Sequence, residues 1–328
     1  LISIILAISS VPTWRRREKL NIDYLGFFIS VIFISGFVLG FMEAPNWGWT
    51  SLPIMGLFLL SIISLITFIG WEKKIPHPLV ELTLFKNLTF TTLFSVLLII
   101  QAVAIVFVFL AIFLQNVLHY SPLMAGLLLL PAMVPIMLMA PVGGHLRDKY
   151  GPTLPMFCGA LLVVLSLIWI AIFSHNRGYA WLFPGLLVYG IGMPLILSGI
   201  MATVMNMVNA QQRGMASAIF NCARQFGNTI GLALLTGLLA SVNKWQLNSF
   251  LHHSPVPLSR LKEQQIDGLL VQSDQAMKAI AHLSLAHIEL LKTAALNAYT
   301  NAFSMTLLAA AILAFLSLFL ILKIPRKQ

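Results

Sequence analysis

The stretch that decides the fold is Gly144-His145-Leu146-Arg147-Asp148-Lys149-Tyr150-Gly151, which lies between two apolar runs long enough to cross a membrane. A short, charged segment bracketed by glycines predicts a tight turn between two hydrophobic helices. Gly144 would let the two helices approach closely, and Gly151 would supply the backbone freedom of the turn. Asp148 would lie near a helix N-terminus, where the helix dipole favours a carboxylate.

The composition points to the same class of protein. Hydrophobic residues make up 59% of the 328 residues and charged residues only 9%, with a mean hydropathy of +0.91. Soluble domains are far more polar. The net charge of +10 comes from basic residues between apolar runs rather than from one basic stripe, so nucleic acid is not an expected partner. The sequence predicts an all-α polytopic membrane protein.

The apolar runs predict the number of membrane spans. About 20 apolar residues are needed to cross ~30 Å of hydrocarbon. Runs of this length occur at about 25–43, 52–71, 91–117, 122–145, 153–173, 180–206, 214–240 and 301–323, which gives eight complete helices. The apolar piece at 1–12 is too short to span and lacks the features of a signal peptide. We interpret it as the remnant of a further helix, in a chain that is N-terminally incomplete.

Lysine and arginine in the loops predict the orientation. If the connections alternate between the two sides, one side holds thirteen of the twenty basic residues, whereas Arg177 is alone in the opposite short loops. Basic loops face the cytosol, so both chain ends, including the tail at 324–328, should be cytosolic. The thirteen residues are Arg15, Arg16, Arg17, Lys19, Lys73, Lys74, Lys86, Arg147, Lys149, Arg213, Lys323, Arg326 and Lys327.

One connection, residues 241–300, is too long for the charge rule to apply. From 261 to 299, leucine, alanine and isoleucine recur at helical spacing between polar residues. Long loops without structure of their own are uncommon. We therefore expect an extracytoplasmic amphipathic loop here, with one or two helices lying against the outer face.

Five segments carry a resemblance to a known family. Through Gly144, Leu146, Asp148, Lys149 and Gly151, the segment at 144–151 resembles the cytosolic loop signature G-x-L-x-D-[RK]-x-G of the major facilitator superfamily. Together with the segments at 43–49, 77–87, 114–126 and 213–228, it resembles the fourteen-helix drug:proton antiporter family of the EmrB/QacA type. The resemblance covers nearly the whole chain.

The resemblance implies a division of the chain. Residue 1 would lie within the family's sixth helix, and residues 13–90 would carry two linking transmembrane helices with cytosolic loops. Residues 91–240 and 301–323 would form the six-helix C-terminal transport bundle of a major facilitator fold. The family's antiport signature in the fifth helix, and the acids of its first helices, would belong to the half of the transporter that this chain lacks.

The resemblance also implies a function: proton-coupled efflux of amphipathic or cationic small molecules, that is, multidrug export, across the bacterial cytoplasmic (inner) membrane. The implied partners are membrane lipid, small-molecule amphiphiles and protons, with a periplasmic adaptor subunit as a further candidate. Two alternatives stay open: a major facilitator transporter of another solute (a lipid, siderophore or metabolite), and a non-transporting fragment or scaffold. The sequence holds no catalytic constellation, P-loop or dinucleotide motif, so we expect neither an enzyme nor a cofactor. The histidines lack metal-ligand spacing.

The seventh span carries a polar stripe. Positions i, i+4, i+7, i+8 and i+11 share one face of a helix, and here they are Ser217, Asn221, Arg224, Gln225 and Asn228. Such a stripe should face a water-filled cavity or another helix, because Arg in mid-membrane costs roughly 2.5–3.5 kcal/mol. Water, backbone carbonyls or an acid of the absent half would be its partner; alternatively, Arg224 is a structural anchor that snorkels to the cytosol. Gln101 and Gln115 are further cavity candidates, or else bridge helices.

Glycines and a proline mark helix contacts. Gly227 and Gly231 are spaced for close helix approach, in a packing or a gating role. Pro194 and Gly199 interrupt the preceding span as a hinge or a static kink. For Asp148 the resemblance implies a latch to a helix end of the opposite bundle. The alternative is a solvated carboxylate paired with Arg147 or Lys149, worth under ~1 kcal/mol.

Overall fold

A computed structural model describes residues 23–76, 78–253 and 285–324 of the chain. Regular structure in these residues is helical, and eight stretches are long and apolar enough to cross a membrane. The predicted all-α polytopic fold and its eight spans are thus confirmed. The expected helix remnant at 1–12, the amphipathic segment at 261–284 and the end of the tail lie outside the described residues.

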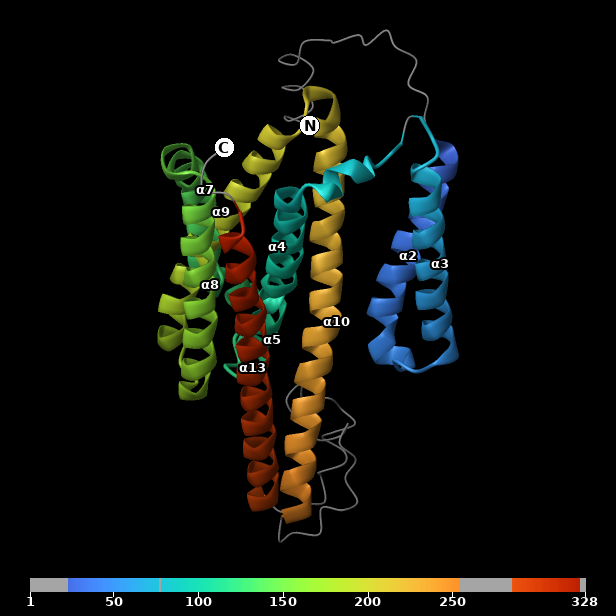
Figure 1. Cartoon of the computed structure of the whole chain (residues 1–328). Coiled ribbons are helices and arrows are strands. Elements are labelled where there is room, and N and C mark those ends of the chain that lie inside the picture. The colour runs from blue at the N-terminus through green and yellow to red at the C-terminus, as the bar shows by residue number, and fades with distance from the viewer. Residues whose placement is uncertain (1–22, 77, 254–284, 325–328) are drawn as a thin grey trace.

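The spans follow one another as up-and-down helices, two of them broken (Figure 1). They are α2 (Tyr24–Trp47), α3 (Leu52–Glu72), α4 with α5 (Leu88–Ala104 and Val106–Asn116), α6 with α7 (Pro122–Leu128 and Leu130–Tyr150), α8 (Thr153–Phe173), α9 (Tyr179–Met207), α10 (Arg213–His253) and α13 (Leu285–Leu322). The short 3₁₀ helices η1 (Leu82–Lys86), η2 (Ser174–Asn176) and η3 (Ala210–Gln212) lie in the connections.

Local sequence signals explain where several helices begin and end. The side chain of Asn87 accepts hydrogen bonds from the backbone N–H of Thr89 and Phe90 and caps α4. Ser121 caps α6 in the same way, directly before Pro122, because the first helical N–H groups need a side-chain acceptor. Pro131 opens α7; a proline ring clashes with the carbonyl four residues earlier, which accounts for the break after α6.

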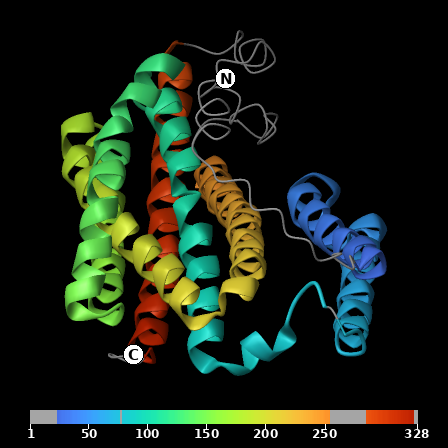
Figure 2. The ribbon, with the colours of Figure 1, turned by 90° about the horizontal axis from the view of Figure 1, so that it is seen from above.

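The main bundle is held together by close helix pairs. α8 packs along α9 and α13, α7 packs along α9, and α10 packs along α4 and α13 (Figures 1 and 2). The α8–α9 contact is made of backbone against backbone, since a Cβ added to Gly159 would lie 2.6 Å from the carbonyl oxygen of Gly192. Small residues permit such approach between membrane helices. The rings of Phe113 and Phe303 stack at 4.4 Å in the core.

The helices α2 and α3 form a separate hairpin beside α10 (Figures 1 and 2). The hairpin meets the bundle through α2, whose Phe33 and Phe37 rings lie 5.6 Å and 5.2 Å from the ring of Phe226 on α10. Many of its large apolar side chains are exposed. In a membrane this surface would contact lipid.

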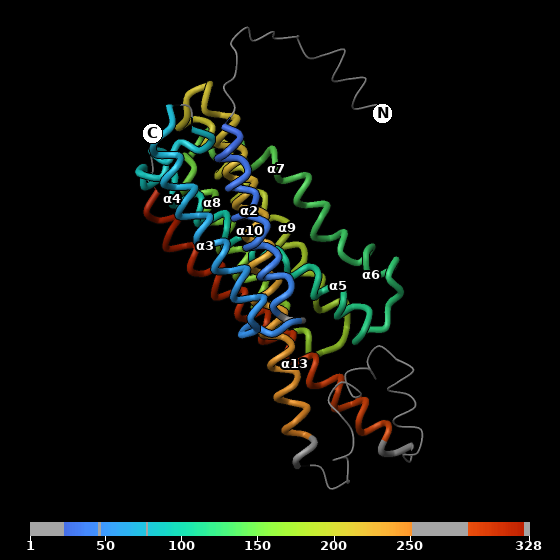
Figure 3. The backbone as a smooth tube through the Cα atoms, turned by 90° about the vertical axis from the view of Figure 1, so that its right-hand side faces the viewer, coloured from blue at the N-terminus to red at the C-terminus, as the bar shows by residue number. Residues whose placement is uncertain are grey.

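Two helices are longer than expected. The spans placed at 214–240 and 301–323 belong to α10 and α13, which continue to His253 and begin at Leu285, so much of the loop expected at 241–300 is continuous helix. At ~1.5 Å per residue, α10 is about twice as long as the hydrocarbon is thick. The two extensions project beyond the other helices (Figure 3). Leu247, Leu291 and Ala295 are buried in them.

The glycines and prolines of the sixth span do not interrupt it. α9 is one helix of 29 residues with Pro184 and Pro194 inside it. A hinge or a static kink at Pro194 and Gly199 stays a prediction, and the residues around Pro194 pack between α7 and α8. Gly190 lies against the backbone of Ala132 on α7, and Gly192 against that of Gly159 on α8.

Candidate functional site

The polar stripe of the seventh span lies on α10, next to the face that α10 buries. Ala216, Phe220 and Ala223 are buried on that face. Of the stripe, Asn221, Arg224 and Gln225 are exposed, and Ser217 and Asn228 are half-buried. Because α10 is continuous, the five side chains share one face.

None of these five side chains has a hydrogen-bond or ion-pair partner among the residues that the structure describes. Arg224 lies eleven residues after the first residue of α10, or ~16 Å along its axis, which is about half the thickness of the hydrocarbon. A guanidinium at this depth needs water or a partner. The face therefore has the chemistry of a wet surface inside the membrane.

An adjoining face of this helix is fixed by two glycines. A Cβ added to Gly227 would lie 2.9 Å from the Cβ of Gln101, and one added to Gly231 would lie 2.5 Å from the Cα of Ala102. Both glycines thus let α10 approach the backbone of α4. The close contact holds the polar face in a defined orientation.

Neither of the two glutamines named as cavity candidates forms a hydrogen bond with a described residue of this face. Gln101 is buried in α4, 5% exposed, beneath Gly227. Gln115 is half-buried on α5, where its amide donates to the carbonyl of Ala111 at 3.1 Å.

An open groove of about 200 Å³ lies between α10 and the hairpin. Ile34 and Val38 of α2 form one wall. Asn221, Cys222, Gln225 and Phe226 of α10 form the other, so that two amides of the polar stripe meet an apolar surface. Sequence reasoning missed this groove because no local pattern says which helix α2 covers.

The charged motif is helical, unlike the expected turn. α7 continues through Tyr150, and the turn is confined to Gly151, at φ +80°, and Pro152. The N–H of Gly151 closes the helix by donating to the carbonyl of Arg147 at 2.8 Å.

Two residues of the motif differ in detail from the expectation. Asp148 lies in the last turn of α7 rather than near a helix N-terminus. There the dipole disfavours a carboxylate, and the neighbouring guanidinium of Arg147 donates to it at 2.9 Å. Gly144 faces open space, whereas Gly143 makes the close helix contact. A Cβ added to Gly143 would lie next to Ser198 and 3.3 Å from the carbonyl oxygen of Pro194. Leu146 is half-buried and Lys149 is exposed.

The residues proposed as a hinge are packed. A Cβ added to Gly199 would lie 2.5 Å from Cγ of Met156 on α8, and Pro194 lies beside Gly143 of α7. Pro194 thus lies beside the residue that directly precedes the motif at 144–151.

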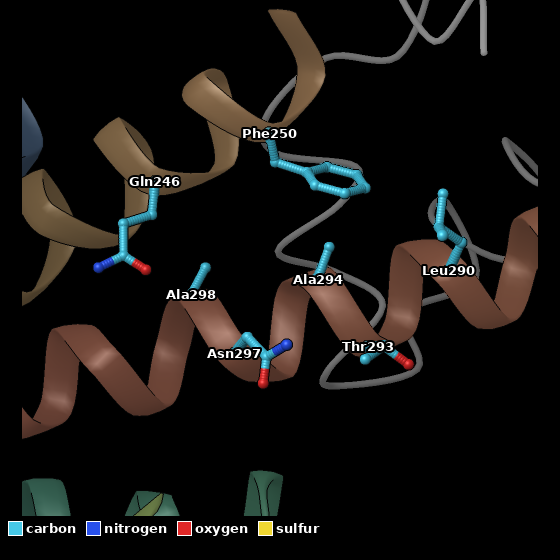
Figure 4. A pocket seen from close by; sticks show the side chains of 7 residues that line it. All are labelled: Gln246, Phe250, Leu290, Thr293, Ala294, Asn297 and Ala298. Atoms are coloured by element: carbon cyan, nitrogen blue, oxygen red, sulfur yellow. The ribbon is translucent and has the colours of Figure 1, made fainter. Parts of the chain in front are cut away.

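A second hollow, of about 240 Å³, separates the extended ends of α10 and α13 (Figure 4). Phe250 projects from α10 toward Leu290 and Ala294 of α13. Nearby, the amide of Asn301 donates to Gln246 at 2.9 Å, and Arg177 donates to Asn297. No local pattern in the sequence predicts these contacts, because they join residues far apart in the chain. In the described part of the chain, no group of three or more His, Cys, Asp or Glu side chains is placed to hold a metal ion.

Comparison with known proteins agrees with this architecture. The model of the Major Facilitator Superfamily matches residues 2–232. Multidrug resistance protein Stp of Mycobacterium tuberculosis is 30% identical over 240 residues, covering 73% of this chain and 44% of that protein. Multidrug transporter protein MdtP of Bacillus subtilis is 23% identical over 337 residues, covering 98% of this chain and 62% of that protein. The chain thus spans about half the length of the relatives it matches.

A solved structure shares the fold. It is the crystal structure of a bacterial homolog to the human lysosomal transporter Spinster, in an inward-facing and occupied conformation, with a TM-score of 0.53 and 14% identity. The match covers 90% of this chain and 66% of that one. With eight apolar helices, a matching family model and a shared fold, the chain belongs to the Major Facilitator Superfamily and is an integral, multi-pass membrane protein.

Proposed function

We propose that the whole protein is a proton-coupled exporter of amphipathic or cationic small molecules, in the fourteen-helix drug:proton antiporter branch (EmrB/QacA type). The family and the relatives, among them proteins named for multidrug resistance, indicate a transporter rather than an enzyme. The observation that carries the proposal is the exposed polar face of α10, which holds Arg224 without a partner among the described residues.

The chemistry of this face suits an amphiphilic cargo. Asn221 and Gln225 offer amide donors and acceptors, and the groove beside them is apolar. A molecule with a polar head and an apolar body could use both surfaces. Transporters of this kind bind substrate near the bilayer midplane and expose it to alternate sides.

Arg224 would supply the coupling. In our proposal a carboxylate of the opposite bundle pairs with Arg224, since the desolvated pair is much stronger than one in water. A proton that neutralises this acid breaks the pair and lets the two bundles separate. Asp148 would latch one of the two states through a helix end of the opposite bundle. We place the protein in the bacterial cytoplasmic membrane, with a periplasmic adaptor as a candidate partner.

The test is transport by the full-length protein in proteoliposomes with an acidic interior. A panel of lipophilic cations and neutral amphiphiles is added to the outside, one compound at a time. We expect substrate addition to release protons from the vesicles, and empty vesicles to show no release. Uptake of a lipid, siderophore or metabolite instead, with no response to the amphiphile panel, would assign another solute. No transport of any of them would leave the scaffold alternative.

A further inference from the structure

Two carboxylates meet at one end of the α2–α3 hairpin, outside the candidate transport site. Asp23 precedes α2, and Glu72 is the last residue of α3. The start of α2 and the end of α3 lie at the same, upper end of the hairpin in Figure 1. Asp23 is well supplied with donors. Its Oδ1 accepts from the N–H of Gly26 at 3.0 Å, and both of its oxygens lie 3.1 Å from Nε1 of Trp71.

Only one of the two carboxylate oxygens of Glu72 has a hydrogen-bond donor. Glu72 is 4% exposed, and its Oε2 accepts a hydrogen bond from the N–H of Val80 at 3.3 Å. Its Oε1 is buried without a hydrogen-bond partner. This oxygen lies near Asp23, because a Cβ added to Gly26 would clash with Oδ2 of Asp23 and lie 3.2 Å from Oε1 of Glu72.

No positive side chain among the described residues neutralises the two acids. Lys73 and Lys74 follow Glu72 but are exposed, and neither acid takes part in an ion pair with a described residue. Glu81 of the linker is bonded to Gln212 and Thr83. On α10, which packs against α2, Cys222 and Arg224 lie level with residues 33–38 of α2, about three helical turns from Asp23.

Two ionised carboxylates in this arrangement would be costly. A buried acceptor left without a donor costs about 1–3 kcal/mol, and more when it is charged. The second carboxylate adds repulsion, and neighbouring carboxylates relieve it by sharing a proton. A proton on Oε1 of Glu72 removes both costs at once, since the new hydroxyl can donate to Asp23.

We propose that Asp23 and Glu72 form a proton-binding site: Oε1 of Glu72 holds the proton and donates it in a hydrogen bond to Asp23, so that the pair carries one negative charge. Loss of the proton would drive apart the first turn of α2 and the last turn of α3, because both carboxylates would then be negatively charged. The linker would follow through Val80, whose N–H donates to Glu72, and through the hydrogen bond from Gln212 of η3, directly before α10, to Glu81. The site rests on the hairpin alone and does not depend on the proposed transport function.

The test is infrared spectroscopy of the purified full-length protein in lipid, at neutral and at alkaline pH. We expect the carbonyl stretching band of a protonated carboxyl group at neutral pH and its loss at alkaline pH. Glu72→Gln, which keeps the size of the side chain, should remove the band. Glu289→Gln, at an exposed position of α13, is the matched control and should leave the band unchanged.

A second variant and a second condition make the result decisive. Asp23→Asn replaces the charged acceptor, so the Glu72 band should shift in frequency, and this variant decides the matter if Glu72→Gln does not insert. Identical spectra for the wild type and Glu72→Gln would overturn the proposal. So would loss of the wild-type band on addition of NaCl or MgCl2 at constant pH, because the pair would then bind a metal cation instead.

Discussion

Arg224 is an exposed guanidinium on a membrane-spanning helix, ~16 Å from the start of α10. A charged side chain that is so costly to insert into a membrane either lines a transport pathway or anchors the helix at the membrane surface. The two roles differ in what its removal does. A pathway residue affects transport but not insertion, whereas an anchor affects insertion first.

Replacing Arg224 by Gln in the full-length protein should therefore lower proton-coupled transport at least about tenfold, which corresponds to ~1.4 kcal/mol. Membrane insertion should not fall, because an insertion cost of roughly 2.5–3.5 kcal/mol is removed. Arg224→Lys should be intermediate, since it keeps the charge but not the planar fork. The measurement is initial transport rate per inserted molecule.

The matched control is Arg213→Gln, another exposed arginine, at the very start of the same helix. It should transport at the wild-type rate. Normal transport by Arg224→Gln together with poor insertion would contradict the pathway role and favour the anchor.

At the scale of the element, the contact between α10 and α4 holds the polar face in place. It is made by glycines, so its strength depends on the distance between two backbones rather than on large side chains. The contact between α7 and α9 is built in the same way, through Gly143. Such contacts tolerate very little added volume.

Gly231→Ala should separate α10 from α4, because the added Cβ would lie 2.5 Å from the Cα of Ala102. Overpacking of this kind typically costs about 1–3 kcal/mol. We expect a lower midpoint of thermal unfolding in detergent. Gly237→Ala on the same helix is the control: its Cβ would meet nothing within 4 Å, so it should be neutral or slightly stabilising. Equal midpoints for the two variants would contradict the packing role.

At the scale of the whole molecule, the helices place the charged end of α7 and the turn between α8 and α9 at opposite ends of α8. The basic loops predict that the first of these is cytosolic. The bundle also carries the paired ends of α10 and α13 well past the other helices (Figure 3). Under this orientation that pair projects on the external side.

The orientation is testable by cysteine labelling in a background with Cys158 and Cys222 changed to Ser. Both test positions, Lys149 and Asn176, are exposed. Asn176→Cys should react with a membrane-impermeant maleimide on intact cells. Lys149→Cys should react only after the cells are opened, because positive loops remain in the cytosol. Labelling of both positions on intact cells, or the reverse pattern, would refute the orientation.

The sequence alone predicted the class of fold, the number of spans and the polar stripe on α10. Hydropathy and the helical period are local properties, so they can be read from neighbouring residues. Helix ends were less accurate: α10 and α13 continue well beyond the expected boundaries. Leu247 and Leu291 are buried in these extensions, and residues 285–299 of α13 belong to the segment that we expected to form a surface helix.

The tertiary structure decided which faces meet. It assigned the close approach to Gly143 rather than Gly144, buried Gln101 under Gly227, and brought Glu72 to Asp23. These contacts join residues far apart in the chain. In lipid they cannot be read from hydropathy, because the face that packs against protein is as apolar as the face that contacts the membrane.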